Sequence, residues 1–330
     1  MIISRTPFRI SFVGGGTDLR DFYAREQGRV LSCGINKYVY VAVKRQIGIV
    51  DHKYRIGWSK VEFKDSIDEI EHPIVRETFR LMNIDFPVEV TTFADVPANT
   101  GLGSSSSFAV GLLHALYALK GQMVTKHTLA STAAHIEVDM LKRSIGKQDH
   151  YAAAYGSLNT FSFYSNEKVL VEPVFYDPVF KQEMEDHMML FYTRLKRDAH
   201  EVLQSQKART SEKFETLQKM RDLTIPLAQV ISDGQDLNRI GEILHEGWLL
   251  KKSITEEISS IEIDDYYERA RKAGAIGGKL LGAGGGGFLL FVVKPDKQVD
   301  VAKALGDLYR MHFKIDSEGT RITYYDQTAF

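Results

Sequence analysis

The chain has little cysteine, no long apolar run and almost no net charge. A single cysteine among 330 residues, Cys33, excludes a disulfide within the chain, so we expect a reducing, cytoplasmic location. The net charge of −1 gives no support to a nucleic-acid or membrane-surface partner, because such partners select an excess of lysine and arginine. Any affinity for an anionic ligand must therefore come from a local arrangement of donors.

Long apolar stretches are also missing. No run approaches the roughly 18 residues that a membrane-spanning helix needs, and residues 1–7 turn polar too early for a secretion signal. The ten histidines show no His-x-x-x-His spacing, so we expect no structural zinc site. With 44% apolar and 26% charged residues, the composition is that of an ordinary globular protein.

Helical and strand-like patterns follow one another without the regular alternation of a doubly wound sheet, which indicates an α+β protein. Runs of β-branched and aromatic residues predict the strands, and apolar residues spaced three or four apart predict the helices. The main predicted strands cover residues 38–43, 88–93 and 288–293, and the main predicted helices cover residues 104–119, 128–143 and 299–313.

The chain is long enough for two domains. The boundary is predicted within residues 172–187, where Pro173, Pro178 and a charged run lie close together. We therefore expect a first domain of residues 1–180 and a second of residues 187–330.

Residues 97–108 form a segment rich in glycine and serine, between a predicted strand and an apolar helix. Gly101 or Gly103 can take a positive φ and let the backbone approach an anion, and the first turn of the helix presents unpaired N–H groups. A flexible linker is the alternative, although linkers seldom stand directly between a strand and an apolar helix. The segment lacks the Gly-Lys-Ser/Thr ending of a Walker A motif. We predict that it grips a nucleoside triphosphate and that the cation for the phosphates comes from elsewhere.

A second glycine run, residues 282–287, formally fits the G-x-G-x-x-G pattern. A dinucleotide-binding fingerprint lies between a strand and a helix, whereas this run precedes a strand. A hairpin that approaches a ligand or the other domain is the better interpretation.

Phosphoryl transfer also needs a metal, a cation and a group that orients the attacking hydroxyl. Glu137 lies on a predicted helix and Asp149 follows twelve residues later, which would place two carboxylates near one site. Arg9 lies on the first strand. Taken alone, each of these residues is better explained as a surface charge or as part of a structural ion pair.

Three segments in chain order resemble the motifs of the GHMP small-molecule kinases, which include galactokinase, homoserine kinase and mevalonate kinase. These segments are residues 5–18, 97–107 and 279–288. The resemblance spans nearly the whole chain. It implies a two-domain GHMP kinase fold, with a ribosomal-protein-S5-like N-terminal domain and a ferredoxin-like C-terminal domain.

Within this superfamily the sequence is similar to the bacterial D-glycero-D-manno-heptose 7-phosphate kinases. The similarity rests on Gly-Gly-Gly-Thr-Asp at residues 14–18, on the serine run at 101–108 and on Gly-Lys-Gln-Asp at 146–149. Kinases of fucose and other hexoses share much of the opening motif.

The resemblance implies ATP and Mg²⁺ as cofactors. Ser105 and Glu137 would bind the metal. Asp149 would act as general base on the acceptor hydroxyl, or position it, and Arg9 would stabilise both this carboxylate and the transferred phosphoryl group. The predicted ATP-binding residues are Pro97, Thr100, Gly101, Leu102, Gly103, Ser104, Ser105, Ser106 and Ser107.

The resemblance also implies where the sugar binds. Asp18 beside Thr17 would accept hydrogen bonds from sugar hydroxyls. A 7-phosphate would need a cationic pocket, for which Arg194 and Arg197 are the candidates, although a solvated charge run explains them equally well. The remaining predicted sugar-binding residues are Gly16, Gly284 and Gly285.

The leading hypothesis is an ATP-dependent kinase that phosphorylates the C1 hydroxyl of a heptose 7-phosphate. The alternatives are a kinase for an unphosphorylated heptose, fucose or galactose, an inactive sensor of sugar and ATP, and an interaction protein. The expected partners are a sugar phosphate and ATP, with no nucleic acid and no membrane, and a homodimer is compatible with the sequence.

Overall fold

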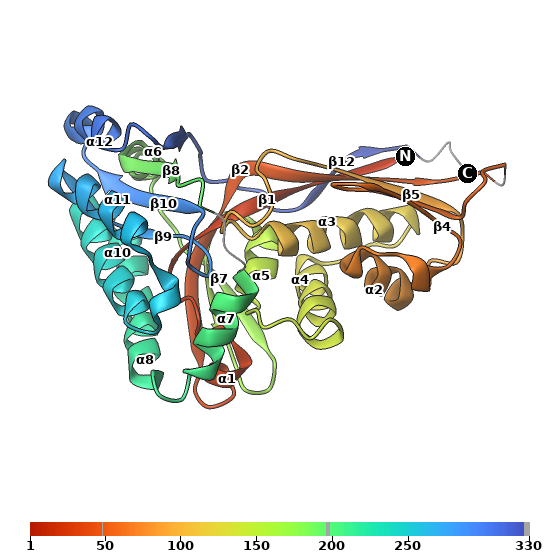
Figure 1. Cartoon of the computed structure of the whole chain (residues 1–330), viewed down its shortest axis with the longest axis horizontal. Coiled ribbons are helices and arrows are strands. Elements are labelled where there is room, and N and C mark those ends of the chain that lie inside the picture. The colour runs from red at the N-terminus through yellow and green to blue at the C-terminus, as the bar shows by residue number, and fades with distance from the viewer. Residues whose placement is uncertain (48, 196–198, 327–330) are drawn as a thin grey trace.

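The computed structural model describes residues 1–47, 49–195 and 199–326 as two bodies side by side, each with a sheet and helices (Figure 1). This arrangement confirms the α+β class. The strands are β1 (Ile2–Val13), β2 (Gly28–Arg45), β3 (Tyr54–Gly57), β4 (Val61–Lys64), β5 (Val88–Ala94), β6 (Leu158–Phe163), β7 (Val169–Pro173), β8 (Met188–Tyr192), β9 (Ala275–Leu280), β10 (Phe288–Val293), β11 (Tyr309–Met311) and β12 (Arg321–Tyr325).

Helices pack against both sheets, and none in the described part of the chain is both long and apolar enough to cross a membrane. The α-helices are α1 (Arg20–Tyr23), α2 (Pro73–Met82), α3 (Ser104–Leu119), α4 (Lys126–Ala134), α5 (Gln148–Tyr155), α6 (Pro178–His187), α7 (Ala199–Ala208), α8 (Phe214–Asp222), α9 (Thr224–Asp233), α10 (Leu237–Lys252), α11 (Ile261–Lys272) and α12 (Gln298–Ala304). Short 3₁₀ turns lie at Ile67–Glu69, Glu256–Ile258 and Pro295–Lys297, and a π-helical segment lies at His135–Met140.

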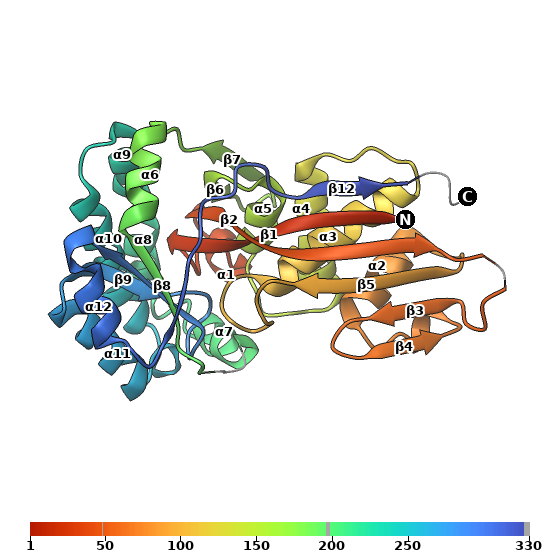
Figure 2. The ribbon, with the colours of Figure 1, turned by 90° about the horizontal axis from the view of Figure 1, so that it is seen from above.

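The first sheet is organised around β2, a strand of 18 residues. One edge of β2 pairs with β1, while the other pairs first with β6 and then with β5. Within the described residues the sheet has eight strands, in the order β12–β1–β2–β5–β3–β4, with β6 and β7 beyond the first half of β2 (Figure 2). The strand before the predicted phosphate loop is therefore a neighbour of β2.

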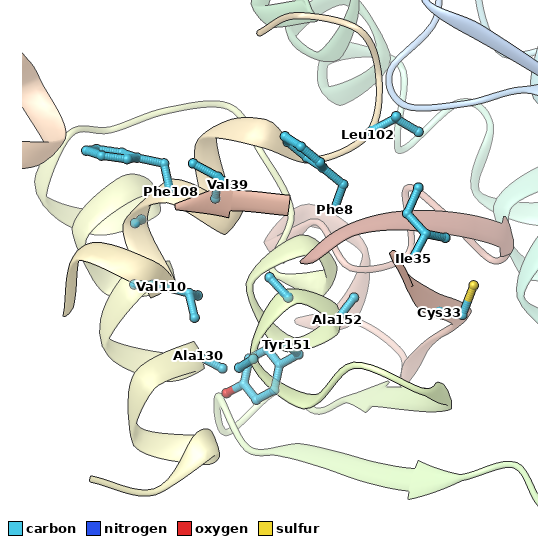
Figure 3. Close-up of a cluster of buried hydrophobic side chains, with 14 of the residues drawn as sticks. Phe8, Cys33, Ile35, Val39, Leu102, Phe108, Val110, Ala130, Tyr151 and Ala152 are labelled. Carbon is cyan, nitrogen blue, oxygen red and sulfur yellow. The ribbon is translucent and has the colours of Figure 1, made fainter. Parts of the chain in front are cut away.

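Helix α3 packs closely on β1 because Gly111 has no side chain at the contact. The Ser4 hydroxyl donates to the Gly111 carbonyl at 2.7 Å, and a Cβ at Gly111 would lie 2.8 Å from Oγ1 of Thr6. Figure 3 shows Val110 of α3 in one apolar cluster with Ala130 of α4 and Tyr151 of α5. This cluster fixes the start of α3 relative to β1.

The second sheet is antiparallel, and in the described residues it has four strands in the order β11–β8–β10–β9. Its core is aromatic. The Tyr267 ring of α11 lies 6.0 Å from the Trp248 ring of α10 and 5.5 Å from the Phe291 ring of β10. These contacts hold α10 and α11 against the sheet.

The chain passes between the two bodies twice. It leaves the first sheet through α6, which lies within the range predicted for the domain boundary, and returns through residues 312–320. Ile315 forms a bridge with Ile35, and β12 then pairs with β1. Residues 321–325 therefore belong to the first sheet, although they follow the second body in sequence.

Two predicted helices differ from the structure. The helix predicted over 299–313 is wrong in its second half, because α12 ends at Ala304 and Tyr309–Met311 is a strand paired with β8. Gly306 separates the two elements, and the apolar residues around it suit either one. The helix predicted over 128–143 is α-helical only to Ala134, where the π-helical segment begins.

Candidate active site

A cavity of about 880 Å³ lies between the two bodies. The first body lines it with the end of β1 and the glycine turn that follows, with the loop before α3 and with the start of α5. The second body contributes residues of α10 and β9 and the turn after β9. The cavity therefore brings together all three segments that resemble kinase motifs.

The loop between β5 and α3 faces the cavity with its backbone. Gly101 and Gly103 have φ angles of +82° and +77°, which side chains other than glycine rarely adopt. No side chain caps α3, and its first backbone bond runs from the Ser107 N–H to the Gly103 carbonyl at 2.9 Å. In the described chain the N–H groups of residues 104–106 are left for a ligand, at the positive end of the helix dipole. Such an arrangement of donors can bind an anion.

Arg9 and Asp149 form a bidentate ion pair beside this loop. The Arg9 Nε and Nη2 donate to the two Asp149 carboxylate oxygens at 2.6 and 2.7 Å, and Nη1 donates to the Gly101 carbonyl at 2.7 Å. Arg9 is 4% exposed, so its guanidinium is shielded from bulk solvent. Asp149 stands in the first turn of α5, where its charge is favourable to the helix dipole.

Glu137 is the centre of a buried polar cluster. Its Oε2 accepts from the His150 Nε2 at 2.9 Å, and its Oε1 accepts from the Ser105 hydroxyl and from the Arg143 guanidinium. Burial alone raises the pKa of Glu137, but the His150 hydrogen bond and the Arg143 charge outweigh it and hold the pKa at about 2. The carboxylate is therefore ionised at neutral pH although it is fully buried.

Arg143 contacts both predicted metal ligands, which also hydrogen-bond each other. Its Nη1 donates to Ser105 Oγ at 2.7 Å and also to Glu137 Oε1. A single cationic group thus bridges a hydroxyl oxygen and a carboxylate oxygen, which are the donor types that Mg²⁺ prefers. The donor set fits a hard divalent cation.

Asp18 lies at another part of the cavity, next to the start of α5. Its carboxylate accepts from the N–H of Gly16 at 3.0 Å and from the side-chain amide of Gln148 at 3.1 Å. Burial, and then the charge of Asp149, raises the pKa of Asp18. Gly146 is needed here because a Cβ would lie 1.8 Å from the Asp18 carboxylate. The Gln148 Oε1 is buried and, in the described chain, has no hydrogen-bond partner.

Two buried lysines of the second body line the same cavity, and the sequence interpretation missed both. Lys251 of α10 donates to the Gly282 carbonyl, and Lys279 of β9 donates to the Ser11 and Phe12 carbonyls at 2.8 and 2.7 Å. Lys251 does carry a signal in the sequence, since it continues the apolar stripe of α10 that includes Trp248.

An aromatic wall forms a further part of the cavity. The His72 ring lies 4.9 Å from the rings of both Trp58 and Phe108. Burial lowers the pKa of His72 to about 4, so the ring is neutral at physiological pH. Trp58 and His72 precede the phosphate loop in sequence, whereas Phe108 directly follows Ser107. No sequence pattern indicated that these three residues would lie together.

Other predicted residues shape the site without facing it. The Thr17 hydroxyl donates to the carbonyls of Gly14 and Arg29, and Ser107 donates to the Pro7 carbonyl. The Thr100 hydroxyl bonds the Pro97 carbonyl, and the Leu102 carbonyl accepts from the Arg9 N–H. Residues that do line the cavity include Gly16, Ser104 and Ser106.

The remaining predicted sugar contacts lie elsewhere. Gly284 and Gly285 approach Ile258, and the Gly285 N–H donates to its carbonyl at 2.9 Å. Arg194 is exposed and does not line the cavity, and Arg197 lies outside the described residues.

The chain matches the models of the GHMP kinases N terminal domain over residues 72–157 and of the GHMP kinases C terminal domain over residues 226–310. Together with the relatives below, these matches show that the chain belongs to the GHMP kinases. It is a sugar kinase that uses ATP as the phosphate donor.

Among its relatives is a D-glycero-alpha-D-manno-heptose 7-phosphate kinase from Campylobacter jejuni, which is 30% identical over 97% of this chain and 98% of its own length. The fold is similar to that of a D-glycero-D-manno-heptose 1-phosphate kinase from Bacteriodes thetaiotaomicron, with a TM-score of 0.81, 26% identity and coverage of 99% and 100% of the two chains. A galactokinase from Thermotoga maritima is 23% identical over 94% of this chain and 95% of its own length.

We predict that Gly103→Ala weakens the binding of ATP about tenfold or more, because its Cβ would lie 3.2 Å from the Asp149 carboxylate and the positive φ costs about 1 kcal/mol. Isothermal titration with Mg·ATP measures the affinity. Gly121→Ala is the matched control, since Gly121 follows α3 with a φ of +67° and has open space around it. Equal affinities of the two variants would contradict the role of Gly103.

Proposed function

We propose that this chain transfers the γ-phosphoryl group of ATP to the anomeric C1 hydroxyl of D-glycero-D-manno-heptose 7-phosphate. The product is the 1,7-bisphosphate, for the synthesis of a nucleotide-activated heptose. The observation that carries this proposal is the Arg9–Asp149 pair between the uncapped start of α3 and the buried acceptors of Asp18 and Gln148. The name of the Campylobacter jejuni relative supports the choice of sugar.

In this proposal the phosphates of ATP lie against the N–H groups at the start of α3. The sugar oxygen attacks the γ-phosphorus, the bond from this phosphorus to the β,γ-bridging oxygen breaks, and ADP leaves. Asp149 accepts the proton of the C1 hydroxyl, which is more acidic than an ordinary alcohol, and Arg9 stabilises the charge on the phosphoryl oxygens. The aromatic wall of Trp58, His72 and Phe108 suits the nucleobase.

Mg²⁺ fits the Glu137 cluster. Ser105 Oγ and Glu137 Oε1 are the residues that would hold it, and the Arg143 guanidinium that bridges these two atoms stands in for its charge. When bound, the metal supplies positive charge to the β- and γ-phosphate oxygens.

In this proposal the sugar hydroxyls donate to acceptors in the part of the cavity around Asp18. Asp18 offers a buried carboxylate, and the Gln148 Oε1 is a buried acceptor that needs a donor. The two acceptors are held side by side, since the Gln148 amide donates to Asp18. This spacing suits neighbouring hydroxyls on one sugar ring.

A kinase for a neutral sugar is the second candidate. It is favoured by the exposed position of Arg194 outside the cavity, because this residue was expected to bind the 7-phosphate. The Arg9–Asp149 pair and the Ser105–Glu137 contact argue against an inactive sensor, which would not need them.

A substrate panel tests the proposal through ADP release with Mg·ATP. The panel holds D-glycero-D-manno-heptose 7-phosphate, the unphosphorylated heptose, D-sedoheptulose 7-phosphate, L-fucose, D-galactose and D-mannose. We expect turnover on the heptose 7-phosphate and little on the others. Turnover only on a neutral sugar supports the second candidate, and silence across the panel with ATP bound contradicts both.

Asp149→Asn should lower kcat by about 10²–10⁴-fold, because the amide cannot accept the hydroxyl proton. Affinity for ATP should change little, since the Asp149 carboxylate bonds the Arg9 guanidinium and, in the described chain, none of the N–H groups at the start of α3. Steady-state kinetics and ATP titration separate the two effects. Asp85→Asn, at an exposed position, is the control, and unchanged turnover of Asp149→Asn overturns the assignment of the base.

Ser105→Ala should raise the Mg²⁺ concentration for half-maximal activity on the order of tenfold, because one of the two proposed metal ligands is lost. A Mg²⁺ titration at saturating ATP and sugar measures this shift. Ser131→Ala removes a serine hydroxyl of α4 that bonds only its own helix. An identical Mg²⁺ dependence of both variants would count against Ser105 as a ligand.

A further inference from the structure

Lys251 and Lys279 are two ammonium groups with no assigned task. Each residue is 7% exposed, and both line the reaction cavity. Among the residues that the structure describes, neither forms an ion pair with a carboxylate, and both donate to backbone carbonyls. A buried charge without an opposite charge is costly to a fold, so a ligand is the natural source of compensation.

Around Lys251 and Lys279, the cavity holds more positive than negative groups. Arg9 is already paired with Asp149, and the only other carboxylate near Lys251 in the described chain is Asp18, whose pKa is raised by burial. Burial first, and then the charge of Arg9, lowers the pKa of Lys251 to about 8, and burial together with Lys251 and Arg9 lowers that of Lys279 well below its usual value. An anion in the cavity would relieve this repulsion and keep the lysines charged.

Both groups have donors to spare. An ammonium group has three N–H bonds. Lys251 uses one on the Gly282 carbonyl, and Lys279 uses two on the carbonyls of Ser11 and Phe12. When both amines are protonated, two N–H donors of Lys251 and one of Lys279 have no partner among the described residues.

The position of Lys251 indicates which kind of ligand it would bind. The Gly282 turn that it bonds lies against the phosphate loop, because a Cβ on Gly282 would come within 2.5 Å of the Gly101 Cα. Gly101 is also the carbonyl partner of Arg9. Lys251 therefore lies where the phosphate loop, Arg9 and the acceptor site of Asp149 and Asp18 converge.

We propose that Lys251, supported by Lys279, is a binding site for a phosphoryl group in the reaction cavity. This inference rests on the proposed kinase function. Two sources share the required chemistry, namely the γ-phosphate of ATP and the phosphate carried by the sugar. If the site binds the sugar phosphate, the lysine contributes the charge that the predicted Arg194 does not bring to the cavity.

The alternative is a purely structural lysine that ties α10 to the Gly282 turn. Two variants separate these roles. Lys251→Met keeps the unbranched chain and loses both charge and donor. Lys251→Gln loses the charge but keeps N–H donors on a slightly shorter side chain, which covers the case that Lys251→Met does not fold. Lys252→Met is the matched control, because Lys252 is the next residue and pairs with Asp264 outside the cavity.

The experiment measures binding without turnover, so it remains informative whichever sugar the enzyme uses. Titrations of the full chain with Mg·AMP-PNP, Mg·ADP, heptose 7-phosphate and the unphosphorylated heptose give four dissociation constants for each variant. We expect Lys251→Gln to lose about tenfold or more for one phosphorylated ligand, while Lys252→Met binds as the unsubstituted protein does.

The pattern of loss identifies the source. A loss for AMP-PNP with ADP unchanged assigns the site to the γ-phosphate, and a loss for heptose 7-phosphate with the neutral heptose unchanged assigns it to the sugar phosphate. The proposal is overturned if both Lys251 variants bind every phosphorylated ligand as tightly as Lys252→Met, whatever their melting temperatures. The substrate panel can fail independently of this result, because the AMP-PNP arm requires no sugar.

Discussion

Arg9 joins three parts of the first body at one point. Its guanidinium binds both carboxylate oxygens of Asp149 and the carbonyl of Gly101, and its own N–H donates to the Leu102 carbonyl. Strand β1, the phosphate loop and helix α5 are thus held together by one buried side chain. Because the loop carries no side-chain cap for α3, its shape depends on these contacts and on its glycines. Arg9 therefore helps to fix the direction of the unpaired N–H groups at the start of α3.

Charge balance organises the rest of the site. Glu137 is ionised because His150, Arg143 and Ser105 surround it, and Asp18 is held by backbone and amide donors. Each carboxylate therefore has a different electrostatic environment within one cavity. Such differences are how neighbouring groups of the same chemical type take on separate tasks.

The sequence predicted the parts of the site that lie in compact motifs. The phosphate loop follows a strand and opens a helix, as glycine and serine patterning indicated, and Arg9, Glu137 and Asp149 line one cavity. It did not predict Lys251 or the His72 wall, because these depend on contacts between segments far apart in the chain. The helix prediction over 299–313 was wrong in its second half for the same reason, since pairing with β8 decides the conformation of Tyr309–Met311.

The pairing of β1 with β12 has a consequence for how the protein is made. Ile2 lies opposite Tyr325, so the first strand obtains this neighbour only after residues 321–325 have left the ribosome. Until then one edge of β1 offers unpaired backbone groups, which other chains can pair with. Contacts this distant in sequence also slow folding, because a long loop must close before they form. A nascent chain of this kinase should therefore depend on protection of the β1 edge late in its synthesis.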